Sequence, residues 1–260
     1  MLELLFFITI TLLLVRHRYF WTARKRPKPP KVMAHRGMKI KSPENTLSSY
    51  KEAISVGFKA IELDILQTQD GTLVCSHNFD LERETNGHGC IHHQNIAKVK
   101  EIQTGIYSHK ANPQSIPTFF DVLATVPEDI FLNIEIKTHR LFDLSAAFTL
   151  GKSIRENGIK HPFMVSSFNP FVVAYYRLFH PNVSIGFILQ DTEWSWVTHW
   201  VHPDYFHPRG DLVDGEMIEM SKRHQLPLNL WTINTAPAMA WCNHNKIASM
   251  ITDNPKVVHA

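Results

Sequence analysis

The chain of 260 residues contains little cysteine. Cys75, Cys90 and Cys242 are odd in number and widely spaced, and no Cys-x-x-Cys pair occurs. This pattern argues against a disulfide framework and gives no zinc-finger spacing. The scarcity of cysteine favours a reducing compartment.

Positive charge is also scarce once the N-terminal segment is set aside. Residues 16–31 contain seven of the 27 Lys and Arg and no acid, and Glu3 precedes them. Residues 32–260 therefore hold 20 basic residues against 23 acidic ones, a formal charge of −3, whereas the whole chain carries +3. A protein that binds duplex nucleic acid needs a basic surface stripe, so no nucleic-acid partner is expected.

The one long apolar run, residues 1–15, is itself short for a membrane span. As a helix it would reach about 22 Å, less than the ~30 Å hydrocarbon core, although residues 19–21 could extend it as an aromatic belt. The basic cluster follows the apolar run, which is the reverse of a secretory signal. We expect a membrane anchor over residues 1–21, transmembrane or peripheral, with the rest of the chain on the cytoplasmic side. An uncleaved signal or a helix lying in the interface remain alternatives.

Residues 22–31 are rich in Pro and basic side chains, which predicts an extended linker rather than part of a core. Anionic lipid headgroups would hold such a segment near a membrane surface. Residues 32–260 then form the globular domain.

Short apolar runs alternate with helical patterns throughout residues 32–260, which is typical of parallel βα units. Eight runs predict strands, and eight units predict a (β/α)8 TIM barrel, a fold of about 250 residues. Asp70-Gly71 predicts a hairpin that joins an extra strand, Leu73–His77, to the second barrel strand. Residues 78–115 are then a long insertion of the kind that carries function. The predicted barrel strands are Val32–His35, Ala60–Ile65, Phe131–Ile136, Phe163–Phe168, Ser184–Leu189, Tyr205–Pro208, Leu228–Ile233 and Met250–Asp253.

Two of these strands carry acids on one face. Glu62 and Asp64 alternate with apolar residues, and so does Glu135. Alternation of this kind often means only a half-exposed strand with solvated carboxylates. In a barrel, however, both faces are covered, and three carboxylates near the C-terminal ends of strands would meet at the mouth, where such enzymes keep their sites. Oxygen ligands of this kind suit Mg²⁺ or Ca²⁺.

Further motifs follow in a fixed order along the chain. Taken together they resemble the glycerophosphodiester phosphodiesterase family, from about Val32 to Pro255. The motifs are His35-Arg36-Gly37, Glu44-Asn45-Thr46, Glu62-x-Asp64, Asp70-Gly71 with His77, Ile116-Pro117-Thr118, Glu135-Ile136-Lys137, Ser167-Phe168, Trp231-Thr232-Ile233-Asn234 and Thr252-Asp253-Asn254-Pro255.

The resemblance implies a role for each motif residue. Glu62, Asp64 and Glu135 would bind the divalent metal, and His35 and His77 would be the acid–base pair. The remaining four residues would bind the substrate. Arg36 and Lys137 would hold the phosphodiester oxygens, and Phe168 and Trp231 would contact the organic group. The implied reaction is hydrolysis of glycerophosphodiesters to sn-glycerol 3-phosphate and an alcohol.

The sequence departs from the family pattern in a few places. Asn78 stands where the family has Asp after the second histidine, and Lys246-Ile247-Ala248 replaces a Gly-Val-Asp. Asn45 is also a candidate helix cap, which would be a purely structural role. Two other functions stay open: a lysophospholipase-D-like enzyme acting on membrane lysophospholipids, and a catalytically silent tethered protein.

Overall fold

A computed structural model describes residues 2–259 and, within that range, eight parallel strands. Each strand pairs with the next around the sheet, and bridges Phe206–Leu228 and Arg209–Trp231 join its two ends. The sheet is therefore a nearly closed parallel barrel, consistent with the predicted (β/α)8 fold. In spatial order the strands are β10 (Asn229–Leu230), β11 (Ser249–Thr252), β1 (Val32–His35), β2 (Ala60–Gln67), β6 (Phe131–Ile136), β7 (Phe163–Ser167), β8 (Ile185–Leu189) and β9 (Tyr205–Pro208).

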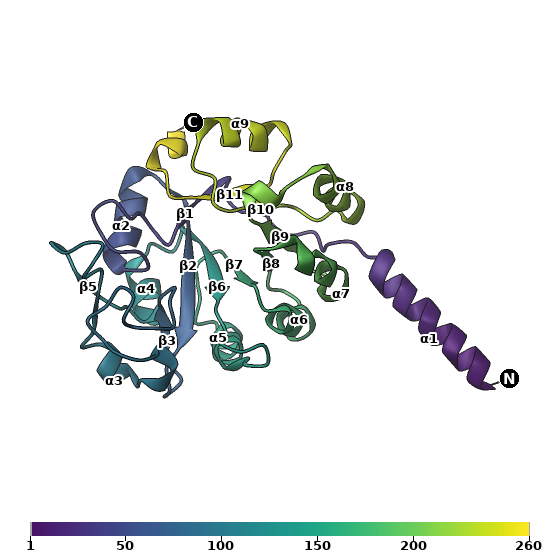
Figure 1. The fold of residues 1–260 in the computed structure, drawn as a ribbon, viewed down its shortest axis with the longest axis horizontal. Helices are drawn as coiled ribbons and strands as arrows, with labels where there is room; N and C mark the ends of the chain where they lie inside the picture. The colour runs from purple at the N-terminus through teal and green to yellow at the C-terminus, as the bar shows by residue number, and fades with distance from the viewer. Residues whose placement is uncertain (1, 260) are drawn as a thin grey trace.

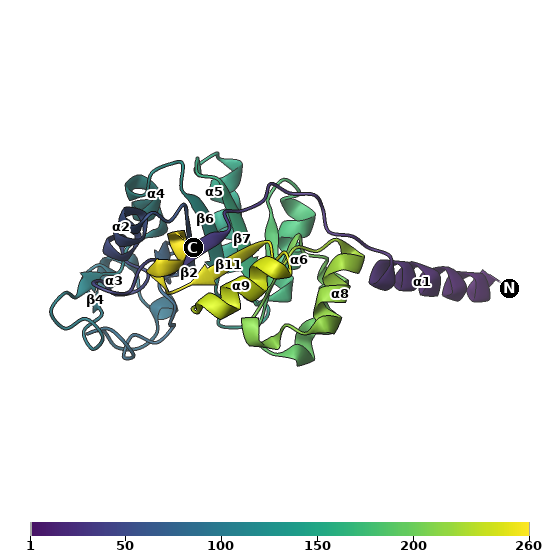
Figure 2. The same ribbon diagram turned by 90° about the horizontal axis from the view of Figure 1, so that it is seen from above.

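Helices surround the sheet, as Figures 1 and 2 show from two directions. Thr46 caps α2 by accepting a hydrogen bond from the Ser49 amide, so the capping role considered for Asn45 is wrong. The helices are α2 (Leu47–Val56), α4 (Phe119–Thr125), α5 (Ser145–Arg155), α6 (Pro170–Phe179), α7 (Thr198–Val201), α8 (Gly215–His224) and α9 (Ala236–His244), with short 3-10 turns at η2 (Thr192–Val197), η3 (Gly210–Leu212) and η4 (Pro255–His259).

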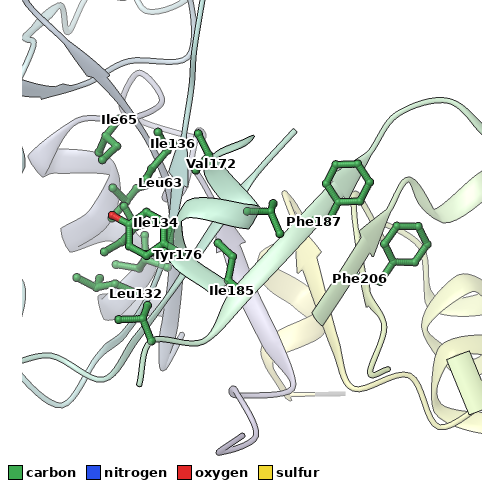
Figure 3. Packing of buried hydrophobic residues seen from close by; sticks show 14 of the residues in the cluster. Leu63, Ile65, Leu132, Ile134, Ile136, Val172, Tyr176, Ile185, Phe187 and Phe206 are labelled. Atoms are coloured by element: carbon green, nitrogen blue, oxygen red, sulfur yellow. The ribbon is translucent and has the colours of Figure 1, made fainter. Parts of the chain in front are cut away.

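The main core lies between the strands and the helices. The apolar residues that alternate with the acids in β2 and β6 point outward into this layer, where Leu63 and Ile134 lie near Tyr176 of α6 (Figure 3). All three side chains are fully buried. Burying a side chain of this size stabilises a fold by about 1.5–3 kcal/mol. Because side chains alternate along a strand, burial of the apolar residues on the outer face makes the alternating acids point into the barrel.

The hairpin after β2 forms as predicted. β3 (Leu73–Cys75) pairs antiparallel with β2, and Gly71 takes the left-handed φ of 86° that the turn requires. The insertion after it holds η1 (Ile91–His93), α3 (Ile96–Val99), β4 (Gln103–Thr104) and β5 (Gln114–Ser115). A separate buried cluster that includes Leu81, Val99 and Ile116 gives the insertion its own small core.

Helix α1 (Leu2–Tyr19) projects away from the barrel in both views (Figures 1 and 2). Its apolar side chains are exposed, and Phe6 and Phe7 are 63% and 67% accessible. Across residues 2–259 the structure has no helix that combines the length and the apolar character needed to cross a bilayer. This finding goes against the transmembrane option for residues 1–21.

The segment after α1 is extended, as expected, but it is not a loose linker. Trp21 is buried between the rings of His202 and His224, at centroid distances of 4.6 and 4.4 Å, and belongs to the main core. Ala23, which lies within the predicted linker of residues 22–31, is buried in the same core. The expectation that the linker lies outside the core is therefore wrong, because its partners come from distant parts of the sequence.

Charged and backbone contacts continue this docking. The buried Asp204 accepts hydrogen bonds from Arg24 and Arg26, so these cations are paired within the protein. Farther along, Tyr205 donates to the carbonyl of Pro27, and Ser249 donates to that of Pro30. Tyr205 and Ser249 begin β9 and β11, so the segment runs across the N-terminal end of the barrel, opposite the predicted mouth.

Candidate active site

Three adjacent strands bring the predicted carboxylates together. His35 of β1 pairs in register with Glu62 of β2, and Asp64 pairs with Glu135 of β6. The three carboxylates are buried, and one oxygen from each lies within 4.8 Å of the others. The side chains that alternate with the outward apolar residues therefore converge on one point inside the barrel.

Two cations face this cluster. Lys137 Nζ lies 3.0 Å from Glu135 and 3.6 Å from Asp64, and Arg36 Nε lies 3.2 Å from Asp64. Three carboxylates against two cations leave a net charge of −1 if all are ionised. A divalent cation would make the site +1, and a bound phosphodiester would neutralise it.

The residues present fit a hard divalent metal. Glu62 Oε1 and Asp64 Oδ1 are buried and have no hydrogen-bond donor among the described residues. Unsatisfied buried carboxylate oxygens are costly, and a cation such as Mg²⁺ or Ca²⁺ is the partner that oxygen ligands of this kind take.

Burial and charge move the pKa values of the cluster in opposite directions. Burial raises the pKa of Glu62 well above its usual range, and the charges of Asp64 and Glu135 add to the effect. Burial also acts on Asp64, but Lys137 and Arg36 outweigh it and lower the pKa of that carboxyl. A fully ionised cluster therefore needs more positive charge than the protein supplies.

The first predicted histidine lies at the end of β1 against a carboxylate. His35 Nδ1 is 2.8 Å from Asp253 Oδ1, and Lys39 Nζ is 2.6 Å from the same oxygen. Burial lowers the pKa of His35, although Asp253 opposes the shift. Burial acts to raise the pKa of Asp253, but His35 and Lys39 outweigh it and hold that pKa far below its usual range, so this carboxylate stays ionised.

The second predicted histidine follows β3. His77 Nδ1 lies 3.0 Å from the amide oxygen of Asn78, the residue that replaces the family's Asp. Burial lowers the pKa of His77, and the charge of Asp64 partly restores it. The imidazole therefore has a hydrogen-bonded partner without a negative charge of its own.

The turn after β1 fixes Arg36. Its amide donates to the Glu62 carboxylate at 3.0 Å, and its guanidinium donates to Glu44 at 2.9 Å. Gly37 has a φ of 80°, and a Cβ there would meet the Ser49 backbone at 2.7 Å, so only glycine fits. This close approach holds Arg36 over the carboxylates.

Asn45 lies at φ 56° and holds Asp64 from two sides. Its amide nitrogen donates to the Asp64 carboxylate at 2.8 Å, and its oxygen accepts from the Asp64 backbone at 3.1 Å. Asn45 therefore belongs to the support of the acidic cluster, a role that its place in the sequence did not show.

A cavity of about 580 Å³ is lined by His35, Arg36, Glu62, His77, Glu135 and Lys137. Phe168 and Trp231 form one wall, with rings at 5.8 Å and nearly perpendicular, and Lys137 Nζ lies 5.7 Å from the Phe168 ring. The structure thus brings eight of the nine sequence-predicted site residues to one cavity, and Asp64 to its buried floor.

A second cavity of about 410 Å³ shares Arg36 and His77 with the first. Its other walls come from the insertion, including Arg83 and Thr104, and from Lys39 and Glu44. The two cavities meet at one guanidinium and one imidazole, so the insertion lines a cavity that adjoins the first.

Comparison with known proteins identifies the family. Residues 35–257 match the model of the glycerophosphoryl diester phosphodiesterase family. A glycerophosphodiester phosphodiesterase from Caldanaerobacter subterraneus is 30% identical over 87% of this chain and 95% of its own length. The chain belongs to the glycerophosphoryl diester phosphodiesterase family. The predicted family and the predicted enzyme class, a phosphoric diester hydrolase, are both confirmed.

Other members of the family agree in extent and in fold. The glycerophosphodiester phosphodiesterase of Bacillus subtilis is 25% identical over 87% of this chain and 84% of its own length. A phosphodiesterase from Oleispira antarctica, solved in complex with the product sn-glycerol-3-phosphate, superimposes with a TM-score of 0.80 at 23% identity, covering 88% of this chain and 95% of its own. A family enzyme from Thermotoga maritima gives 0.69 at 22% identity, over 89% and 98% of the two chains.

Proposed function

We propose that this phosphodiesterase hydrolyses glycerophosphodiesters to sn-glycerol 3-phosphate and an alcohol. The observation that carries the proposal is the convergence of three buried carboxylates and two imidazoles on one cavity at the mouth of the barrel. The Oleispira antarctica neighbour was solved with the product sn-glycerol-3-phosphate, which supports the choice of substrate.

Glu62, Asp64 and Glu135 would hold a divalent cation, Mg²⁺ or Ca²⁺, which supplies positive charge to the phosphoryl oxygens as negative charge builds up on them. Arg36 and Lys137 act on the same oxygens from the protein side, because both cations line the cavity beside the cluster. Loss of one such stabilising donor typically costs about 10²–10³ in rate.

The two imidazoles divide the proton transfers. His35 acts as the base, since the ionised Asp253 beside it stabilises the imidazolium formed when His35 takes the proton of the nucleophile. His77 acts as the acid and protonates the departing alkoxide. Asn78 orients the ring through a neutral amide. Because the amide carries no negative charge, it does not stabilise the protonated imidazole, and His77 gives up its proton more readily. Phe168 and Trp231 pack against the organic group.

A product assay tests this proposal. The purified chain is given Mg²⁺ or Ca²⁺ and a panel of glycerophosphodiesters, and the products are monitored by phosphorus NMR. Release of sn-glycerol 3-phosphate is expected. A transient cyclic phosphate in the same spectra would identify the neighbouring glycerol hydroxyl as the nucleophile. No release from any glycerophosphodiester with either metal would contradict the proposal.

His77→Ala is expected to reduce turnover by at least about 10², the scale of a lost general acid. The matched control is His244→Ala, because His244 is exposed at the end of α9, outside both cavities. Near-normal turnover in His77→Ala would overturn the acid–base assignment.

A second candidate substrate is a membrane lysophospholipid. Phe142 lies in the connection after β6 and Phe171 in the first turn of α6, at the rim that also carries Phe168. Their rings are 4.9 Å apart, and Phe142 is 78% exposed. An exposed aromatic pair beside a substrate cavity is a surface that an acyl chain or a lipid interface would cover.

Helix α1 supports a location at a lipid surface. It exposes apolar side chains around its circumference and carries Arg16, His17 and Arg18 in its last turn. We propose that its apolar side chains enter a lipid surface and that the helix acts as a peripheral anchor. The full chain should cosediment with vesicles of neutral and anionic lipid. A chain without residues 1–19 should stay in solution. Equal cosedimentation of both would contradict the anchor.

A further inference from the structure

A second cluster of metal-binding side chains lies in the insertion, separate from the three carboxylates. One ligand atom each from Cys90, His92 and His93 lies within 4.8 Å of the others. Bonds of about 2.0–2.3 Å in a tetrahedral zinc site place ligand atoms about 3.3–3.8 Å apart, so small side-chain rotations bring these three to bonding distance.

The local backbone explains why they converge. Cys90 precedes the 3-10 turn η1, and the His93 amide donates to the Cys90 carbonyl at 3.0 Å. This hydrogen bond closes the turn on Cys90, whose own backbone is extended, and brings Cys90 back beside His93. Ile91 between them is buried in the small core of the insertion, which anchors the turn.

His92 completes the set. Its Nδ1 is buried and has no hydrogen-bond partner in the described part of the chain. Its ring lies 4.1 Å from that of His93 and stacks at 4.1 Å on His139, a residue of the connection after β6. A buried imidazole nitrogen without a partner beside a thiol and a second imidazole is the arrangement that a soft cation satisfies.

We infer that Cys90, His92 and His93 form a second metal site, selective for a thiolate-binding cation such as Zn²⁺, with water at the fourth position. The donor set separates it from the catalytic cluster. One thiolate and two imidazoles select Zn²⁺, whereas three carboxylates select Mg²⁺ or Ca²⁺.

The site is tied to the segment that follows His77. The Ile91 amide donates to the Phe79 carbonyl at 2.9 Å, and Cys90 pairs with Asp80 in an isolated bridge. The Phe79 side chain lines the catalytic cavity. A cation held at Cys90 and both histidines would therefore stiffen one wall of that cavity.

Cobalt(II) titration of the full chain in excess Mg²⁺ tests the inference. A thiolate-to-cobalt charge-transfer band in the near ultraviolet is expected to saturate at one equivalent. Cys90→Ser should abolish the band, and His93→Ala should weaken cobalt binding at least about tenfold. His88→Ala is the matched control, because this neighbouring histidine has a side chain that is 90% exposed, and it should leave the band unchanged.

Two results would overturn the inference: no thiolate band in the wild type, or an undiminished band in Cys90→Ser. Thermal unfolding adds an independent reading. Zn²⁺ should raise the melting temperature of the wild type more than that of His93→Ala, and equal shifts would count against the site. His93 is exposed, so its replacement keeps the test valid if Cys90→Ser folds poorly.

Discussion

His35 Nδ1 and Asp253 Oδ1 lie 2.8 Å apart and connect the first barrel strand to the end of the last one. In the proposed mechanism the carboxylate holds the ring by Nδ1 and stabilises its protonated form. Asp253→Asn should therefore lower kcat by about 10–100-fold and leave KM nearly unchanged, because a general base contributes on the order of 10²–10⁴. Steady-state kinetics with glycerophosphocholine measure both constants.

The control for this change is Asp129→Asn, which makes the same replacement at an exposed residue between α4 and β6. If Asp253→Asn changed KM and left kcat intact, Asp253 would contact the substrate and would not position the histidine.

Metal removal tests the acidic cluster. Chelation with EDTA should abolish turnover, and Mg²⁺ or Ca²⁺ should restore it, since Glu62 Oε1 and Asp64 Oδ1 are buried and have no hydrogen-bond donor among the described residues. Glu135→Gln should shift the metal concentration needed for half-maximal activity upward by tenfold or more. Full activity in EDTA would show that the reaction needs no dissociable ion.

The extended segment after α1 should stabilise the barrel, whereas α1 itself should not. Removing residues 1–19 leaves Trp21 and the Arg24–Asp204 pair in place, and the free energy of unfolding should change by at most about 1 kcal/mol. Removing residues 1–31 exposes the site of Trp21, and loss of a buried aromatic side chain costs about 3–5 kcal/mol. Urea unfolding measures the free energy of unfolding of both truncated chains. Equal values would contradict the claim that the segment after α1 stabilises the barrel.

Acid should destabilise the fold through His207. This fully buried residue of β9 bonds Asn229 through Nε2 at 3.0 Å, and burial lowers its pKa to about 3. Its unfolded pKa is about 6.5, so between pH 6.5 and 3 the unfolded chain takes up a proton that the folded chain refuses. Stability then falls as the pH falls, by about 1.4 kcal/mol per pH unit from this group.

His207→Gln removes that titration. Urea unfolding at pH 7 and pH 4.5 should show a loss of stability on acidification that is smaller in His207→Gln by about 2–3 kcal/mol. His88→Ala should keep the wild-type difference. An unchanged difference in His207→Gln would mean that another group takes up the proton.

Much of the barrel was predictable because its strands carry their signal locally. The alternation around Glu62 and Glu135 fixed both the strands and the inward face, and each of the eight predicted strands overlaps an observed one. The strand predicted as Leu228–Ile233 is observed only at Asn229–Leu230, because β10 meets β9 through isolated bridges rather than a continuous ladder.

Contacts between residues far apart in the chain were not predictable. Asp204 pairs with Arg24 across about 180 positions of the sequence. The basic segment was therefore predicted as a linker, although it is docked on the barrel. Asn45 was assigned to a helix end because no local signal points to Asp64. Cys90 was dismissed for want of a second cysteine, although two histidines beside it supply the other donors.

The most direct test of the central claim is a crystal structure of the full chain with Ca²⁺ and sn-glycerol 3-phosphate. The account predicts one ion bound by Glu62, Asp64 and Glu135, with the phosphate oxygens against Arg36 and Lys137 and within hydrogen-bond reach of His35 and His77. An ion bound away from these carboxylates, or a phosphate that contacts neither imidazole, would contradict it.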